Sequence, residues 1–295
     1  MIPVDLSGKV ALVTGVGDNQ SFAWFIAKAL QSAGAKLVFA SHPRMVGIVE
    51  NLLENSKEED VKARVLPYGG GSLKVDKVFA CDVAFDNMES VDEKTRGDRR
   101  WNKHGDFTIK GMIDQVAPRY GNIDILIHSI AFSPEIKNKA VDTSRAAYLQ
   151  ALSISAYSLT ALTKACVPLM ENRPGGASVV GLSYIGGERV VPHYGGGMST
   201  AKAALQLDAK VLASNVGTKN IRVNIISAGP YASRAASAIG DIDQMISYAA
   251  QRSPLPRGIT PEEVANATVF LCSPLASAIT AHVLYVDCGY NAMGL

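Results

Sequence analysis

Cysteine is scarce in this 295-residue sequence, and the four that occur are scattered along the chain. None of them has CxxC or other metal-ligand spacing, and isolated thiols are typical of a reducing compartment. The N-terminal residues lack the charged and apolar segments of a signal peptide, and no apolar run is long enough to span a membrane. We therefore expect a soluble cytosolic protein, or a mature organelle protein without its transit peptide, with no metal site and no membrane association.

An excess of charge of one sign is lacking too. The 29 Lys and Arg residues nearly balance the 27 Asp and Glu residues, which leaves a net charge of +2. No Lys/Arg-rich run resembles a nucleic-acid-binding patch, so no nucleic-acid partner is expected. Because 47% of the residues are hydrophobic and 19% are charged, we expect a large core. The densest charge, at Val91–Asp106, mixes both signs and is typical of a solvated loop.

Short β-branched runs alternate with helical patterns along most of the chain. This alternation predicts an α/β fold, a single Rossmann-type doubly wound parallel sheet with helices on both faces. The expected strands are Val10–Thr14, Lys36–Ala40, Val78–Cys81, Ile123–His128, Ser178–Leu182, Arg222–Ile226 and Val283–Val286. Expected helices include Phe22–Ala33, Phe107–Tyr120, Arg145–Met170, Ser199–Asn215 and Pro261–Leu271.

No Gly/Ser-rich linker and no internal repeat divides the chain. Residues 1–295 are therefore expected to form one domain. A region at about 57–106, interrupted by the run Gly69-Gly70-Gly71, looks like an insertion into that domain rather than a boundary between two.

The turn after the first strand predicts a dinucleotide site. Gly15 follows the strand, and Ser21 and Phe22 open the next helix. Such a turn lets backbone N–H groups and a helix N-terminus face a pyrophosphate. The motif is degraded, because Ser21 and Ala23 stand where the fingerprint has glycine, and taken alone it fits a purely structural turn equally well. The Ser21 hydroxyl is expected either to contact a phosphate or to cap the helix.

Three further strand ends supply candidate cofactor contacts. At the second, where an acidic residue usually binds the ribose diol, His42 could stack on adenine and Arg44 could meet a phosphate, although either could be an ordinary surface residue. After the third, Asp82 precedes Val83 and can accept from the adenine amino group or cap a helix. After the fourth, small residues line the expected crevice, namely Ser129, Ile130 and Ala131.

A tyrosine and a lysine after the fifth strand suit hydride-transfer chemistry. A phenol can hydrogen-bond a developing oxyanion, while an ammonium lowers the phenol pKa and holds ribose hydroxyls. None of the ten tyrosines has a lysine four residues later, the usual short-chain dehydrogenase spacing, and Tyr194 and Lys202 are eight apart. A continuous helix would separate them by about 12 Å along its axis. The glycines at Gly195–Gly197 instead favour a loop that brings Tyr194 back toward Lys202.

Together these motifs resemble one branch of the short-chain dehydrogenase superfamily. The chain resembles the enoyl-acyl-carrier-protein reductases of bacterial and plastid type II fatty-acid synthesis, in which two active-site tyrosines ten residues apart precede a lysine. Here those residues are Tyr184, Tyr194 and Lys202. The glycine-rich stretch His193–Met198 and the long insertion resemble the plastid-type branch. Other similar segments are Ile123–Pro134, Arg222–Pro230, Ser233–Ile239 and Tyr285–Gly294.

This resemblance implies an activity. Hydride would pass from NADH, in preference to NADPH, to the β-carbon of a trans-2-enoyl thioester carried by acyl-carrier protein. Tyr194 would donate to the thioester oxygen, Lys202 would fix the cofactor ribose, and Tyr184 would shape the thioester pocket. Pro230 and Ser233 would contact the cofactor. The resemblance further implies a homotetramer in the bacterial cytoplasm, with the plastid stroma as the alternative.

The acyl chain is expected to lie under a lid at about 232–253. This segment is rich in alanine, and Gly240 interrupts its helical pattern. Its apolar side chains are expected to pack with Met245 and Tyr248 of the same lid. The expected substrate contacts besides the two tyrosines are Met198, Ala235, Ala236 and Ile239.

Two departures from the plastid-type pattern affect the expected site. His42 stands where that branch has Trp, and Tyr231 stands where it tends to have Leu or Ile. Two rival functions share the fold. A carbonyl-reducing short-chain dehydrogenase should show Tyr-x-x-x-Lys, which is absent. A non-catalytic dinucleotide sensor often loses the catalytic tyrosine or lysine, and both are present here.

Overall fold

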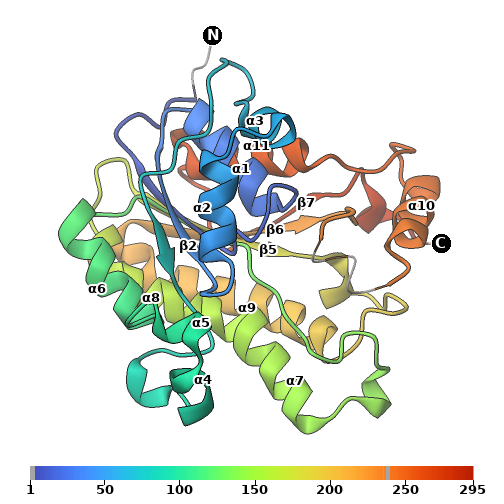
Figure 1. Cartoon of the computed structure of the whole chain (residues 1–295). Coiled ribbons are helices and arrows are strands. Elements are labelled where there is room, and N and C mark those ends of the chain that lie inside the picture. Colours follow the sequence, from blue (N-terminus) through green and yellow to red (C-terminus); the bar gives the residue numbers. More distant parts are fainter. Residues whose placement is uncertain (1–3, 235, 237–239, 295) are drawn as a thin grey trace.

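Seven parallel strands form a single sheet in the order β3-β2-β1-β4-β5-β6-β7 (Figure 1). The computed structural model describes residues 4–234, 236 and 240–294. The order reverses between β1 and β4, and doubly wound sheets bind ligands at the carboxyl edge of such a reversal. The predicted fold class is confirmed. The strands are β1 (Val10–Thr14), β2 (Lys36–Ser41), β3 (Val78–Ala80), β4 (Ile125–His128), β5 (Ala177–Ser183), β6 (Ile221–Ala228) and β7 (Val283–Val286).

Helices cover both faces of the sheet. α1, α2 and α11 lie over one face, and α6, α8 and α9 lie over the other. The helices are α1 (Phe22–Ser32), α2 (Val46–Glu54), α3 (Glu58–Arg64), α4 (Glu93–Gly97), α5 (Arg99–Asn102), α6 (Ile109–Tyr120), α7 (Arg145–Leu152), α8 (Ser158–Met170), α9 (Met198–Val216), α10 (Ile242–Arg252) and α11 (Pro261–Cys272). Short turns include η1 (Met88–Ser90), η2 (Ala140–Asp142), η4 (Ile185–Gly187), η5 (Gly217–Lys219), η7 (Pro274–Ala276) and η8 (Tyr290–Ala292).

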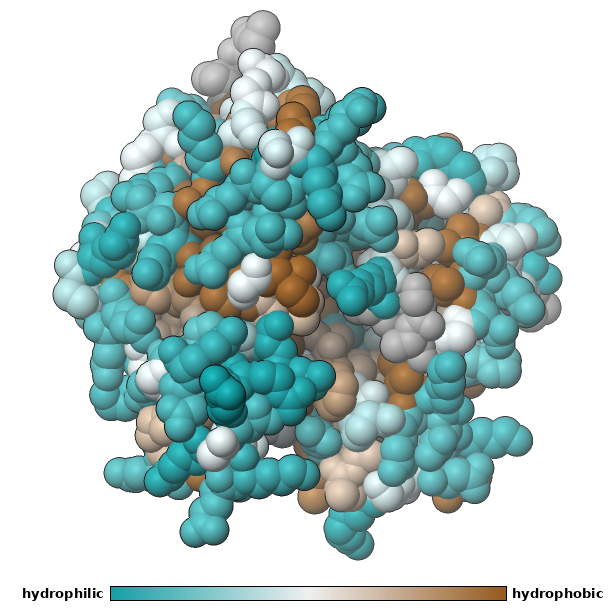
Figure 2. Space-filling model, in the orientation of Figure 1, coloured by the Kyte–Doolittle hydropathy of each residue, from teal (hydrophilic) through white to brown (hydrophobic). Residues whose placement is uncertain are grey.

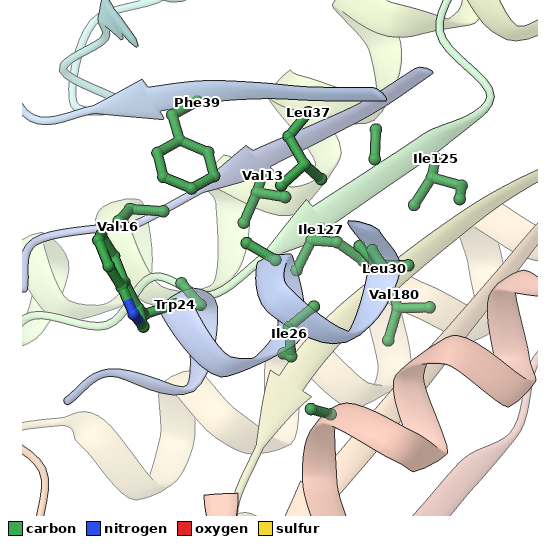
Figure 3. Packing of buried hydrophobic residues seen from close by; sticks show 14 of the residues in the cluster. Val13, Val16, Trp24, Ile26, Leu30, Leu37, Phe39, Ile125, Ile127 and Val180 are labelled. Carbon is green, nitrogen blue, oxygen red and sulfur yellow. The ribbon is translucent and has the colours of Figure 1, made fainter. Parts of the chain in front are cut away.

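The first helix illustrates how the sequence builds this core. Apolar residues recur on one side of α1, and Trp24, Ile26 and Leu30 are fully buried. In Figure 3, Trp24 lies beside Val16, which follows β1, and Leu30 lies beside Ile127 of β4. Because the strands are covered on both faces, their sequences are almost continuously apolar, and this is why they could be located from the sequence.

The long helix predicted at Arg145–Met170 is divided by a π-helical turn, η3, at Ser153–Tyr157. Two buried serines account for the difference. The Ser155 hydroxyl donates to the carbonyl of Phe132 and accepts from the Phe132 N–H, and Ser158 bonds to the end of β4. The turn therefore ties the helix to the loop that follows β4. Such π turns occur frequently at functional sites.

The region 57–106 contributes both to the sheet and to its carboxyl edge. Within it, β3 pairs with β2 at one side of the sheet, whereas α4 and α5 lie beyond the carboxyl end of β3 (Figure 1).

Across the described ranges 4–234, 236 and 240–294, no helix combines the length and the apolar character needed to cross a membrane.

Candidate active site

The ends of β1 and β4 approach each other closely at the carboxyl edge of the sheet. Gly15, at φ 80°, lies so near the loop after β4 that a Cβ there would sit 2.0 Å from the carbonyl oxygen of Ser129. Only glycine fits this conformation and this approach. The same loop continues through Ile130 and Ala131, which are at least partly accessible. The predicted cofactor residues of β1 and β4 are thus brought together.

The N-terminus of α1 follows the turn that begins at Gly15. Ser21 caps the helix, since its hydroxyl accepts from the Trp24 N–H at 3.4 Å and donates to the carbonyl of Asp18 at 3.1 Å. The first turn carries no acidic residue. The turn has no room for a side chain at Gly15, and an 11-residue helix follows it. Its backbone N–H groups and the positive end of the helix dipole therefore suit a pyrophosphate. Of the two expected roles of Ser21, the structure shows the cap.

The adenine end of the expected site is built differently from the prediction. His42, expected to stack on adenine, lies edge to face against Trp101, with ring centroids 5.2 Å apart at 83°. Its Nε2 is 3.4 Å from Oδ2 of Asp82, which also accepts from Trp101 Nε1 at 2.8 Å. Trp101 was missed at the sequence level; a single tryptophan in a charged segment was the available signal.

Asp82 is buried, and its charge is supported by these neighbours. Burial alone would raise the pKa of the carboxyl group, but hydrogen bonds from His42 and Trp101 outweigh it, so the pKa lies below the ordinary value. The carboxylate is therefore ionised and able to accept hydrogen bonds. Val83, the next predicted cofactor residue, is also buried. Arg44 is exposed, with its guanidinium carbon 5.9 Å from the Trp101 ring centroid.

Two tyrosines meet beyond the end of β5. The rings of Tyr184 and Tyr194 lie edge to face, with centroids 5.1 Å apart. Tyr194 is buried and packs with Met198, the predicted substrate contact, at the start of α9. Burial raises the pKa of both phenols, so both are protonated at neutral pH. The α9 helix begins at Met198, which confirms that Tyr194 lies in a preceding loop rather than on the helix of Lys202.

Lys202 is 5% exposed and lies on the first turns of α9. Its Nζ donates to the carbonyl of Leu182, near the end of β5, at 2.8 Å. Burial lowers the pKa of the ammonium to about 8. The η4 turn connects this lysine to the tyrosines. A Cβ added to Gly186 would lie 2.7 Å from Tyr194 Cδ1, and a Cβ added to Gly187 would lie 3.0 Å from Lys202 Cβ.

His128, the last residue of β4, is a further buried group beside Lys202. Its Nε2 is 2.7 Å from the hydroxyl of Ser158, which donates to the carbonyl of Ile154. Ser158 therefore accepts from the imidazole, so Nε2 carries the proton. Burial, together with the charge of Lys202, lowers the pKa of His128 to about 3. The imidazole is neutral, and Lys202 carries the positive charge at this point of the site.

The segment after β6 closes the opposite side of the edge. The Tyr231 ring lies 5.2 Å from that of Phe22, at the start of α1. Among the predicted contacts here, Pro230 is partly buried, and the Ala236 N–H donates to the Ser233 hydroxyl at 3.2 Å. Ala235 and Ile239 lie outside the described residues.

In the predicted lid, α10 begins at Ile242. Arg252 lies over Tyr248, with its guanidinium carbon 3.7 Å from the ring centroid. The space-filling view shows a hollow at the centre of the face seen in Figure 1, bounded by hydrophobic as well as hydrophilic residues (Figure 2). Among the residues that the structure describes, no group of three or more His, Cys, Asp or Glu side chains could hold a metal ion.

Comparisons with known proteins agree with this geometry. The family model described as enoyl-(acyl carrier protein) reductase matches residues 102–291. The chain is 46% identical to the chloroplastic enoyl-acyl-carrier-protein reductase (NADH) of Arabidopsis thaliana, over all of this chain and 74% of the relative. It is 39% identical to the enoyl-acyl-carrier-protein reductase (NADH) FabI of a Nostoc species, over 99% of this chain and all of the relative.

A solved structure is similar over nearly the whole chain. The crystal structure of Plasmodium berghei enoyl-acyl-carrier-protein reductase with triclosan superposes with a TM-score of 0.89 at 38% sequence identity. The match covers 97% of this chain and 98% of that one. The similarity therefore extends through the sheet, both helical layers and the segments that surround the carboxyl edge.

Proposed function

Because the chain belongs to the NADH-dependent enoyl-acyl-carrier-protein reductase family of the short-chain dehydrogenase superfamily, we propose that it reduces trans-2-enoyl thioesters in fatty-acid elongation. One observation carries the proposal. Two protonated tyrosines, the buried Tyr194 and the partly buried Tyr184, meet beside the buried ammonium of Lys202 at the carboxyl edge of a dinucleotide-binding sheet. This arrangement combines a neutral hydrogen-bond donor with a fixed positive charge.

The carboxyl edge fits NADH, which supplies a hydride when bound. Gly15 and the N-terminus of α1 would hold the pyrophosphate. Asp82, Val83 and the Ser129–Ala131 loop would surround the adenosine half, and Lys202 would donate to the nicotinamide ribose. Pro230, Ser233 and Phe22 would line the nicotinamide end.

Tyr194 is proposed to stabilise the charge that develops on the thioester oxygen. Its raised pKa keeps the phenol protonated, so it donates a hydrogen bond to the oxygen as negative charge builds up there. Lys202 contributes a positive charge from a buried position, where charges act more strongly than in solution. Tyr184 is proposed to hold the Tyr194 ring and to form one wall of the thioester pocket.

We propose that the acyl chain binds between the tyrosines and the segment 232–253. Met198 packs directly on Tyr194, so it lies where the substrate would pass. Ala236 is proposed to face the acyl chain, and α10 would move to admit a substrate attached to acyl-carrier protein.

The assembly and compartment are proposed from the family. Leu149 of α7 and Leu207 and Val211 of α9 are exposed apolar side chains on two helices that pack against each other. Such a face suits contact with further copies of the chain. We propose a homotetramer, working in the bacterial cytoplasm or the plastid stroma.

The test is oxidation of NADH by the purified protein in the presence of crotonyl and longer trans-2-enoyl thioesters. The proposal predicts NADH consumption with formation of the saturated thioester. Binding of NADH without turnover of any enoyl thioester would indicate a dinucleotide sensor instead. Turnover confined to ketones would indicate a carbonyl reductase.

A further inference from the structure

The inserted region reaches the predicted cofactor site through one side chain. Trp101, on the short helix α5, is one of only two tryptophans in the chain. Its indole Nε1 donates to Oδ2 of Asp82 at 2.8 Å, and its ring is met edge-on by His42. Both partners belong to strand ends of the dinucleotide fold, whereas Trp101 comes from the charged segment that looked like a solvated loop.

This contact is part of a wider attachment. The ring nitrogen Nε2 of His104 lies 3.0 Å from the carbonyl of Pro43, just after β2. The N–H of Asp82 donates to the carbonyl of Phe107 at 2.7 Å. The segment is thus held against the ends of both β2 and β3. Trp101 lies three residues before His104, so the position of its indole is determined by the attachment of the whole segment rather than by a single bond.

The hydrogen bonds of Asp82 show what the indole controls. One oxygen accepts from Trp101, and the other accepts from the Ala84 N–H at 3.1 Å. Each carboxylate oxygen has two lone pairs, so the group can accept further donors. An indole N–H can donate a hydrogen bond but cannot accept one. It therefore fixes the rotation of the Asp82 carboxylate and does not itself accept a hydrogen bond from the ligand. Without it, only the Ala84 N–H and His42, whose Nε2 is 3.4 Å from Oδ2, would remain to orient the carboxylate.

We infer that Trp101 is the positioning residue that orients Asp82 toward the 6-amino group of the cofactor adenine. The inference rests on the proposed function, because it requires that this edge binds an adenine dinucleotide. It assigns the insertion a role in cofactor affinity that acts through Asp82. A carboxylate that is already oriented loses less conformational freedom when the cofactor binds, and the smaller entropy cost raises the affinity.

The test compares two cofactors that differ at one group. NADH carries the adenine 6-amino group, and reduced nicotinamide hypoxanthine dinucleotide carries an oxygen in its place. Calorimetric titration of the Trp101→Phe variant should show the Kd for NADH raised about tenfold, the size expected for one hydrogen bond to a charged group. The Kd for the hypoxanthine analogue should change less than about twofold, because that ligand offers Asp82 no amino donor.

Two further variants separate positioning from folding. Trp24→Phe removes the other indole, whose Nε1 donates to the carbonyl of Ala63 at 3.0 Å. It should lower the Tm yet leave the preference for NADH over the analogue unchanged. Trp101→His keeps a ring N–H donor and should restore most of the preference, which also covers the case in which Trp101→Phe folds poorly.

The outcomes are distinct. An equal rise of both Kd values in Trp101→Phe would show a merely structural role and overturn the inference, as would no change in either. Failure of the wild-type protein to bind either dinucleotide would instead contradict the proposed function. Binding with preserved discrimination in Trp101→Phe would leave the proposed function intact and the inference wrong.

Discussion

The rings of Tyr184 and Tyr194 lie edge to face, with centroids 5.1 Å apart and an interplanar angle of 72°. The edge of one ring therefore meets the face of the other, an arrangement that aromatic pairs favour. Gly186 packs against both rings, within the η4 turn that also touches Lys202 through Gly187. One short turn thus contacts both tyrosine rings and the neighbouring Lys202.

The two tyrosines are expected to differ in their contribution. Tyr194→Phe removes the proposed donor to the thioester oxygen, and loss of one such donor typically lowers kcat by about 10²–10³. Cofactor affinity should change little. Tyr184→Phe keeps the ring-to-ring contact and is the matched control, with kcat within about tenfold of wild type. Steady-state kinetics with crotonyl thioester measure both; near-normal kcat in Tyr194→Phe would transfer the role to Tyr184.

Gly186→Ala should impair the enzyme by displacing Tyr194. The added Cβ would lie 2.7 Å from Cδ1 of that ring, closer than side chains tolerate. A displacement of about 1 Å can cost about 10²-fold in rate, so we expect kcat to fall by at least about tenfold. Gly217→Ala is the control, because nothing lies within 4 Å of its added Cβ. Equal kcat in the two variants would show that the η4 contact does not position Tyr194.

Activity should depend on pH through Lys202. Burial lowers the pKa of this ammonium to about 8, so its charge is lost as the pH rises through that value. We expect kcat/KM for NADH to fall above pH about 8, since kcat/KM reports groups of the free enzyme. Lys202→Arg keeps its charge at every accessible pH and should abolish the fall, at a lower absolute rate. A wild-type profile that stays flat to pH about 10 would contradict the assignment.

The same shift has a consequence for stability. The pKa of Lys202 is lower in the folded protein than in the unfolded chain, so burying the charged ammonium lowers the free energy of unfolding at low pH. This cost disappears as the pH rises toward the pKa of the unfolded chain, because the lysine is then neutral in both states. The Lys202→Met variant without cofactor should therefore exceed the wild-type Tm at pH about 7 by more than at pH about 10. Thermal unfolding at the two pH values measures the difference.

NADH should be preferred over NADPH by at least about tenfold in kcat/KM. The guanidinium carbon of Arg44 lies 5.9 Å from the Trp101 ring centroid, so binding of a 2′-phosphate to Arg44 would compete with this cation–π contact. Arg44→Ala should lower the residual activity with NADPH and leave that with NADH unchanged. Arg100→Ala, which removes the neighbouring guanidinium, is the control. A preference for NADPH in the wild type would show that Arg44 binds a 2′-phosphate.

The strands and the loop before α9 could be predicted because their signals are local. Buried parallel strands require continuous apolar runs, and β1 was predicted with its observed bounds at Val10–Thr14. The glycines between Tyr194 and Lys202 favoured a loop over a single helix, and α9 indeed begins after them. What brings the pair together, the η4 turn, contains no residue whose chemistry would identify it in advance.

Features that depend on distant contacts could not be predicted. The π turn in the long helix follows from the hydrogen bonds between Ser155 and Phe132. These two residues are brought together only when the sheet and its helices have formed. The position of His42 depends on Trp101, which comes from a segment whose mixed charges indicated only a solvated loop. In both cases a polar or aromatic side chain finds a partner that sequence spacing does not reveal.

The most direct test of the account is the ratio of kcat/KM for crotonyl thioester to kcat/KM for acetoacetyl thioester with NADH. In conjugate reduction, charge develops on the thioester oxygen, two carbons from the carbon that receives hydride; in ketone reduction, it develops on the oxygen of that same carbon. Tyr194 precedes the helix of Lys202 instead of lying one turn before the lysine, and we expect this placement to favour the displaced oxygen. Because reaction needs close and aligned atoms, we predict a ratio above about 10². Comparable values for the two thioesters would contradict the assignment and indicate a carbonyl reductase.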